Sequence, residues 1–186
     1  ESRYAGSLSN EEQAFVRTFA TLPMAARALL VPLIMRRGPL FLASKIQYEE
    51  IGDLTQALEP LVELKWIDCN PRPTITQVSS LLTKRTLAAH FGIPLSWSKE
   101  LLRAQLEAQH LEPKLASEWS IFGTQGVIEV KIAALCTHLQ LLFFGNWHQG
   151  WQEFVLSDLG IFKYEPVLTD GVARAFESRA HIDAFY

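Results

Sequence analysis

Apolar residues recur at helical spacing in the first part of the chain and predict two consecutive helices. Ser9, with Glu12 three residues later, is a capping-box signature that opens a helix ending by Leu22. A second apolar face follows Pro23 and stops at the Arg-Arg-Gly-Pro run of residues 36–39. The chain therefore begins with a pair of short amphipathic helices.

The pattern then changes to short strand-like runs around one more helix. Residues 40–42 read as a strand, and Asp53 caps a helix. Residues 66–68 and 74–76 flank the turn at 70–73 and predict a hairpin. The order helix, helix, strand, helix, hairpin indicates a winged-helix-like unit with a short hairpin.

A second helical pair follows within residues 77–111. One helix contains residues 81–87, Gly92 permits the positive backbone angle that ends it, and Pro94 keeps the connection extended. Ser98 caps the next helix. This arrangement resembles the SAP module, a short DNA-binding helix–extended–helix fold.

The expected fold class is mainly α. We predict a winged-helix-like domain over residues 1–76, a SAP-like unit over 77–111, and a helical segment over 112–186 that leads toward further domains. Glu1 is not an initiator methionine, and residues 172–186 contain no Pro and no closing Gly, so we expect a fragment of a longer protein.

The segment from Phe143 to Glu165 carries the most specific pattern. It reads Phe-Phe-Gly-Asn, a polar break, an amphipathic run ending in Asp158-Leu159-Gly160, and then Phe162-Lys163-Tyr164-Glu165. These residues resemble a segment of bacterial members of the Fanconi-associated nuclease family, DNA-repair enzymes with a VRR-type nuclease domain. The winged-helix-like and SAP-like units precede it in the family's order.

That resemblance implies a parent enzyme that cuts branched DNA, with a preference for 5′ flaps, in the repair of interstrand crosslinks. It implies Mg²⁺ or Mn²⁺ in a C-terminal nuclease domain absent from this chain, and a bacterial cytoplasmic protein associated with the nucleoid. The expected partners are branched or flap DNA and the protein's own nuclease domain. For this chain the resemblance implies the part that holds and positions the DNA.

Charge is unevenly distributed along the chain. The net charge is −3 over 186 residues, yet residues 13–48 and 69–99 contain no acidic residue. Such segregation can create a local positive face, although scattered solvated side chains would give the same counts. The candidate DNA-binding residues are Lys84, Arg85, Ser98 and Lys99, followed by Arg36, Arg37, Lys45, Arg72 and Arg103.

From its motifs, the sequence predicts no catalytic residue, no metal site and no cofactor in this chain. One Glu-x-Lys string lies at residues 63–65 and another at residues 129–131. A restriction-type centre needs carboxylates that converge on a metal ion, and neither a preceding Pro-Asp step nor a Val-Arg-Arg motif accompanies the second string. No apolar run reaches the roughly 18 residues of a membrane helix, so we expect no membrane partner.

Two alternatives remain open from sequence. The chain could be a non-catalytic helical scaffold for protein contacts, with its basic windows in solvent. It could also be a winged-helix transcription factor, but the helix predicted from Asp53 to Lys65 is acidic where DNA reading needs basic residues. The roles of Trp97, Trp147 and Trp151 are undecided.

Overall fold

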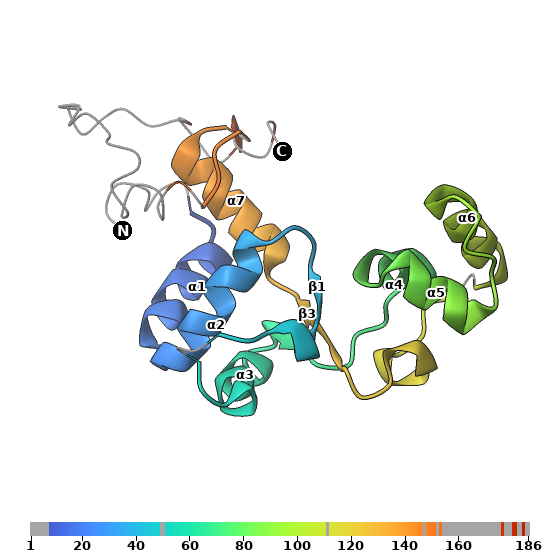
Figure 1. Ribbon diagram of the computed structural model, residues 1–186. Coiled ribbons are helices and arrows are strands. Elements are labelled where there is room, and N and C mark those ends of the chain that lie inside the picture. Colours follow the sequence, from blue (N-terminus) through green and yellow to red (C-terminus); the bar gives the residue numbers. More distant parts are fainter. Residues whose placement is uncertain are drawn as a thin grey trace. The chain divides into compact units, whose positions relative to one another are not determined.

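The structure, a computed structural model, describes residues 8–48, 51–110, 112–146, 148–151, 153, 176, 180, 181 and 184. These residues form helices with one small sheet (Figure 1), which confirms the mainly α fold class. Most of the Phe143–Glu165 pattern, the amphipathic run and the residues after it, falls outside the described residues. The chain divides into two compact units, a terminal unit of residues 1–37 and 132–186 and a central unit of residues 38–131.

The terminal unit contains α1 (Asn10–Thr21), α2 (Met24–Met35) and α7 (Ala133–Phe144). The predicted capping box of α1 is confirmed, because the Ser9 amide donates to Glu12 Oε2 at 2.7 Å and the Glu12 amide donates to Ser9 Oγ at 3.1 Å. Leu29, Leu30 and Leu33 of α2 are buried, as the apolar face predicts. Local capping thus accounts for the start of α1, and one apolar face accounts for the packing of α2.

The central unit contains a three-stranded sheet made of β1 (Leu40–Leu42), β2 (Ile67–Asp68) and β3 (Val127–Val130). Their order is β1-β3-β2, and both neighbours of β3 are antiparallel to it. In the sequence, the short turn η1 (Ala43–Lys45) follows β1, and the helix α3 (Leu54–Glu63) precedes β2. The strand that joins the sheet together therefore comes from far along the chain.

The predicted hairpin between residues 66–68 and 74–76 is wrong. Thr74 is not in a strand but caps α4 (Ile75–Leu81), through a capping box in which the Thr74 amide donates to Gln77 Oε1 at 2.8 Å. The Gln77 amide returns a bond to Thr74 Oγ1 at 3.3 Å. A Thr-x-x-Gln box satisfies two amides at a helix start, so the residues after Pro73 form a helix. The second strand of the expected hairpin is replaced by β3.

The predicted single helix over residues 81–87 is also wrong, because α4 ends at Leu81 and α5 (Lys84–Phe91) begins anew after Thr83. The Thr83 hydroxyl accepts from the Thr86 amide at 3.2 Å, which caps a separate helix. Gly92 ends α5 with φ of 66°, as predicted. The last helix of this group, α6 (Lys99–Gln109), is followed by the short turns η2 (Ala116–Glu118) and η3 (Ser120–Phe122).

A core holds α4, α5 and α6 together with the turns that follow them. Val78, Leu87, Leu102 and Leu106 are fully buried, and Trp119 packs in the same cluster. Burial of four such side chains stabilises the group by roughly 1.5–3 kcal/mol each. This core is the platform that fixes where the basic side chains of α5 and α6 lie.

Candidate nucleic-acid interface

Both α5 and α6 begin with a hydroxyl cap followed by a lysine. Ser98 Oγ accepts from the Leu101 amide at 3.1 Å, which confirms the predicted cap of α6, and Thr83 plays the same part for α5. Lys84 and Lys99 are the first residues of the two helices. Amide groups in a first helical turn carry partial positive charge and bind anions, and a lysine at that place adds a full charge.

The two helix starts share one electrostatic environment. Glu100, in the first turn of α6, has a lowered pKa, caused first by its own backbone amide, then by the Ser98 hydroxyl and by the charges of Lys99 and Lys84. The charge of Lys84, on α5, is therefore felt at the start of α6. At the other end of the two helices the ring centroids of Phe91 and His110 are 5.4 Å apart. The buried residues Leu87 of α5 and Leu102 and Leu106 of α6 belong to one core cluster.

Four of the predicted basic residues lie on α5 and α6. Lys84 is half-buried, whereas Arg85 and Lys99 are exposed. Arg103 lies one turn after Lys99 and donates from Nε to Glu107 Oε1 at 3.1 Å. We name Lys84, Arg85, Lys99 and Arg103 the α5–α6 basic group. Its charges adjoin two helix N-termini whose dipoles add to them.

The other predicted DNA-binding residues lie elsewhere. Lys45 is exposed in η1, and Arg72 is exposed between the buried Pro71 and Pro73. Both belong to the central unit, but among the described residues no ion pair or hydrogen bond links them to the α5–α6 basic group. Arg36 and Arg37 are exposed at the end of α2, in the terminal unit. Ser98 is exposed but is already used as a helix cap.

One cation near α6 was missed by the sequence reasoning. Lys114 Nζ lies 5.5 Å from the ring centroid of Trp119, and the His110 and Trp119 rings are 5.5 Å apart. These two rings pack edge to face beyond the end of α6, and Lys114 follows the predicted SAP-like unit. The pattern of residues 112–119 carries no local signal for this contact, because it depends on the tertiary packing of Trp119 against α5 and α6.

The helix that would read DNA in a winged-helix protein is α3, and it is acidic as predicted. Asp53 caps it by accepting from the Thr55 amide at 2.8 Å, and Glu59 and Glu63 are exposed. Val62 and Leu64 at its end are also exposed, at 40% and 39%. Carboxylates on this surface would repel a phosphate backbone, so α3 is unsuited to the major groove.

Neither the Glu-x-Lys string at residues 63–65 nor the one at residues 129–131 is organised as a metal centre. Glu63 ends α3, and Lys65 follows with φ of 58°. Glu129 lies on β3, and its Oε2 accepts from Lys131 Nζ at 3.1 Å. In the part of the chain that the structure describes, no three His, Cys, Asp or Glu side chains gather as they would around a metal ion. No helix within that same part is long and apolar enough to cross a membrane.

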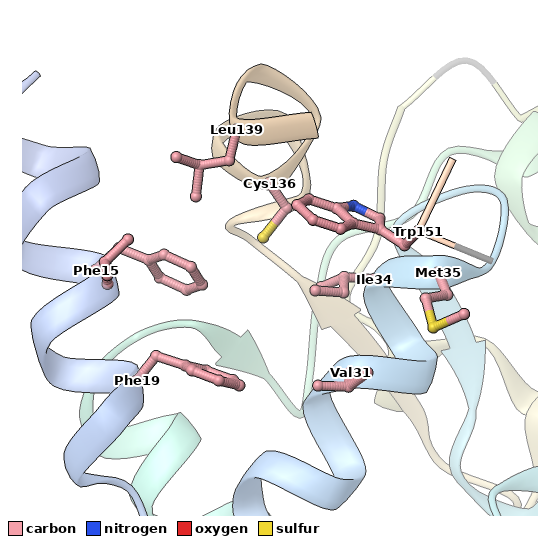
Figure 2. Close-up of a pocket in the computed structure, with 9 residues that line it drawn as sticks. Phe15, Phe19, Val31, Ile34, Met35, Cys136, Leu139 and Trp151 are labelled. Atoms are coloured by element: carbon pink, nitrogen blue, oxygen red, sulfur yellow. The ribbon is translucent and has the colours of Figure 1, made fainter. Parts of the chain in front are cut away.

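The terminal unit contains a cavity of about 340 Å³, but its lining is apolar (Figure 2). Phe15 and Phe19 of α1 point into it, opposite Ile34 of α2, with Trp151 across from them. The only ionisable group on the lining is the Cys136 thiol, whose pKa is raised to about 12 by burial. With no charge and no cluster of donors, this cavity is unsuited to phosphate.

The sequence of this chain is similar to part of several known nucleases. A family model described as "FAN1, HTH domain" matches residues 1–68. The Fanconi-associated nuclease 1 homolog of Pseudomonas aeruginosa is 41% identical over 98% of this chain. The homologs of Arabidopsis thaliana and of Oryza sativa are 25% and 29% identical over 94% and 84% of the chain. The chain spans about a third of the length of the bacterial relative, 33%, and 21% and 18% of the plant relatives.

Solved structures agree with the sequence comparison. A crystal structure of paFAN1 bound to DNA with a 2-nt 5′ flap and a gap matches 98% of this chain with a TM-score of 0.89 and 41% identity. A second, with a 1-nt 5′ flap, matches the same share with a TM-score of 0.87 and 40% identity. This chain covers 34% of each of those chains. The resemblance predicted from the Phe-Phe-Gly-Asn segment is confirmed, because nearly the whole chain is similar to one part of a bacterial Fanconi-associated nuclease 1 homolog.

Proposed function

We propose that this chain is the DNA-holding part of a structure-specific nuclease, and that it positions a 5′-flap duplex for cutting. The observation that carries the proposal is that the two paFAN1 structures it matches are both bound to 5′-flap DNA. Within the chain, the α5–α6 basic group is the surface that fits this role. The same kinship supports a place of action on chromosomal DNA in the bacterial cytoplasm.

Phosphates are the chemical groups that this surface suits. Lys84 and Lys99 offer point charges, Arg85 offers a guanidinium, and α5 and α6 each begin with a hydroxyl cap and first-turn amides next to these cations. Lys99 and Arg103 are separated by one helical turn, about 6 Å along α6, so they can contact different phosphates of one strand. Contacts of this kind depend on charge and shape and carry little sequence information.

The acidic helix α3 has a different proposed use. Its exposed Glu59 and Glu63 exclude close contact with a DNA backbone, while the exposed Val62 and Leu64 offer apolar surface beside them. We assign this end of α3 to contact with another part of the protein. Under this proposal the end of α3 serves protein contacts, and the α5–α6 basic group serves DNA binding.

Cutting is assigned to a nuclease domain of the whole protein, which would hold Mg²⁺ or Mn²⁺ there. Glu129 does not fit as a metal ligand of this chain, because its carboxylate already accepts from Lys131 Nζ at 3.1 Å and no second carboxylate joins it among the described residues. The repair of interstrand crosslinks, and contact between this chain and the nuclease domain, are parts of the same proposal.

Fluorescence anisotropy with 5′-flap, blunt-duplex and single-stranded DNA across a salt series tests the proposal. We expect preferential, salt-sensitive binding to the flap. The double variant Lys84→Ala/Lys99→Ala should bind all sequences more weakly. The negative slope of log K against log salt should become less steep by about 2, since each phosphate contact contributes about 0.9 to its magnitude.

The matched control is Lys131→Ala, which removes an exposed lysine of the same unit whose charge is already paired with Glu129. Its salt slope should stay close to that of the unchanged chain. An unchanged slope in the Lys84/Lys99 variant would remove the α5–α6 basic group from the interface. Equal, weak binding to all three DNAs would assign branch recognition to another part of the protein.

A further inference from the structure

The outer face of α6 alternates positive and negative side chains. A groove of about 420 Å³ is lined by Lys99, Glu100, Arg103, Ala104 and Glu107. Each cation of this face has a carboxylate beside it, because Arg103 pairs with Glu107 and Glu100 lies within the field of Lys99 and Lys84. A surface evolved only for tight phosphate binding would not need these two acids. Their placement therefore calls for an explanation.

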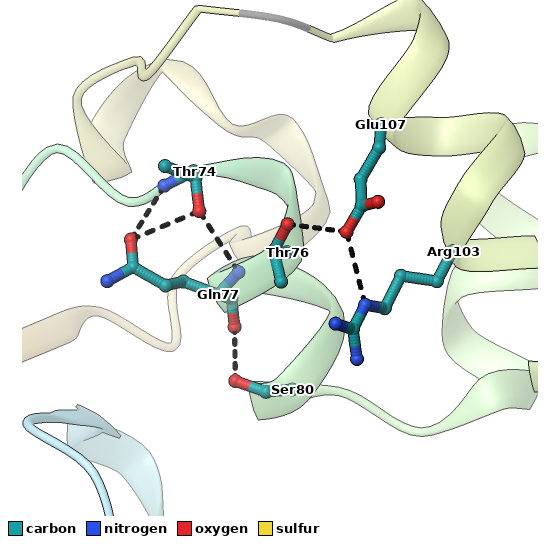
Figure 3. A network of polar contacts seen from close by, with 6 residues as sticks. All are labelled: Thr74, Thr76, Gln77, Ser80, Arg103 and Glu107. Carbon is teal, nitrogen blue, oxygen red and sulfur yellow. Dashed lines mark hydrogen bonds and ion pairs between the residues drawn. The ribbon is translucent and has the colours of Figure 1, made fainter. Parts of the chain in front are cut away.

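Glu107 is held in place from two directions (Figure 3). Its Oε1 accepts from Thr76 Oγ1 of α4 at 2.6 Å and from Arg103 Nε of α6 at 3.1 Å. These bonds lower the pKa of Glu107, with the Thr76 hydroxyl as the larger cause and the Arg103 guanidinium as the next. The carboxylate thus stays ionised at neutral pH and stays next to Arg103, where it offsets part of that charge.

Glu100 lies in the first turn of α6, directly after Lys99, and lines the same groove. Its backbone amide and the Ser98 hydroxyl lower the pKa of its carboxyl. First-turn amides are the groups that bind phosphate oxygens at a helix start. A DNA phosphate at this position must therefore displace the Glu100 side chain or accept its repulsion.

We propose that Glu100 and Glu107 are selectivity residues, which weaken the hold of the α5–α6 basic group on plain duplex so that stable binding requires a second contact at the branch. The inference rests on the proposed function, because it assumes that DNA binds at this group. A weak first contact joined to a second one gives a steep preference for DNA that offers both. The two carboxylates thereby convert a general anion-binding surface into a discriminating one.

The test is the double variant Glu100→Gln/Glu107→Gln, measured by anisotropy on 5′-flap and blunt-duplex DNA across a salt series. Glutamine keeps a side-chain oxygen that can accept from Thr76 but removes both negative charges. We expect duplex binding to tighten by about ten-fold near physiological salt and the salt slope to steepen by up to about 2. Flap binding should tighten less, so the ratio of flap to duplex affinity should fall.

The matched control is Glu59→Gln/Glu63→Gln, which makes the same change of net charge on the exposed face of α3 in the same unit. It should leave the ratio of flap to duplex affinity unchanged. An equal gain in duplex binding from this control would overturn the proposal, because the effect would then reflect net charge alone. Circular dichroism of both variants checks that the helices are intact.

Failure of the inference and failure of the proposed function give different results. If the unchanged chain binds the flap in a salt-sensitive way but Glu100→Gln/Glu107→Gln keeps the same ratio of affinities, the inference is overturned and the DNA-holding function stands. If neither protein binds any of the DNAs, both are overturned. If Glu100→Gln/Glu107→Gln binds duplex and the unchanged chain does not, the proposal that these two carboxylates weaken duplex binding is supported.

Discussion

Thr76 Oγ1 donates a 2.6 Å hydrogen bond to Glu107 Oε1 and so joins α4 to α6 across 31 positions of sequence. The substitution Thr76→Val keeps the shape of the side chain but removes the donor. We expect a small loss in the free energy of unfolding, since a hydrogen bond to a charged acceptor is stronger than a neutral one but the Glu107 carboxylate is solvated. The expected result is a slightly lower Tm.

Differential scanning calorimetry measures this effect. Thr124→Val is the matched control, because Thr124 is exposed in the loop before β3. Its Tm should change by much less than that of Thr76→Val. Equal Tm values for Thr76→Val and the unchanged chain would show that the bond contributes nothing net to stability.

Glu107 also makes stability depend on pH. Its pKa in the folded chain lies below the ordinary value of 4.5, chiefly because Thr76 and Arg103 stabilise the ionised form. A carboxyl whose folded pKa is lowered adds stability above its unfolded pKa, and the contribution is lost as pH falls through the folded pKa. The difference in stability between the unchanged chain and Glu107→Gln should therefore be largest near neutral pH and should shrink below about pH 4.

Urea unfolding at pH 7 and at pH 3 measures that difference. Glu63→Gln on α3 makes the same change of charge at an exposed position, and it reports what net charge alone does. A stability difference for Glu107→Gln that is the same at both pH values would contradict the assigned contacts.

Gly92 ends α5 in the left-handed conformation, with φ of 66°. A Cβ at this position would meet no atom within 4 Å, so the cost of Gly92→Ala is conformational and not a clash. We expect a loss of about 1 kcal/mol in the free energy of unfolding. Gly92→Asn should lose less, because asparagine tolerates this conformation better than alanine does. Thermal unfolding of the two variants gives the comparison, and a reversed order would contradict the assignment.

Local chemistry explains which elements could be predicted. The capping box at Ser9, the cap at Ser98 and the stop at Gly92 each depend on a few neighbouring residues, and all three occur as expected. The sheet could not be predicted in the same way. Its central strand β3 lies far from β1 and β2 in the sequence, and pairing at that range depends on the packed core.

In the candidate site, too, features set by neighbouring residues could be predicted and features set by the packed core could not. Lys99 was predicted from the Ser98 cap and Lys84 from its place in a window without acidic residues, but Thr83 was expected inside a helix and not as a second cap. The packing of α5 with α6 depends on Leu87, Leu102 and Leu106, which meet in one core. The partners of Arg103 were missed for a related reason, since Thr76 reaches Glu107 only after α4 has formed where a strand was expected.

The two cysteines should differ greatly in reactivity. Cys136 lines the apolar cavity of the terminal unit with 3% exposure, and burial raises the pKa of its thiol to about 12. Cys69 is exposed, although partial burial and the neighbouring Asp68 raise its pKa as well. The thiolate is the reactive form, so a pKa of about 12 against an ordinary 9.0 leaves roughly a thousand-fold less thiolate at pH 8.

Alkylation with iodoacetamide at pH 8, followed by peptide mass spectrometry, measures the two rates. We expect Cys69 to be modified in the folded chain and Cys136 to be modified only in denaturant. The variant Cys69→Ser should then be almost inert until it unfolds, which isolates the signal of the buried thiol. Fast modification of Cys136 in the folded chain would mean that α1, α2 and α7 separate often enough to admit the reagent, because no polar path leads through the apolar lining of that cavity.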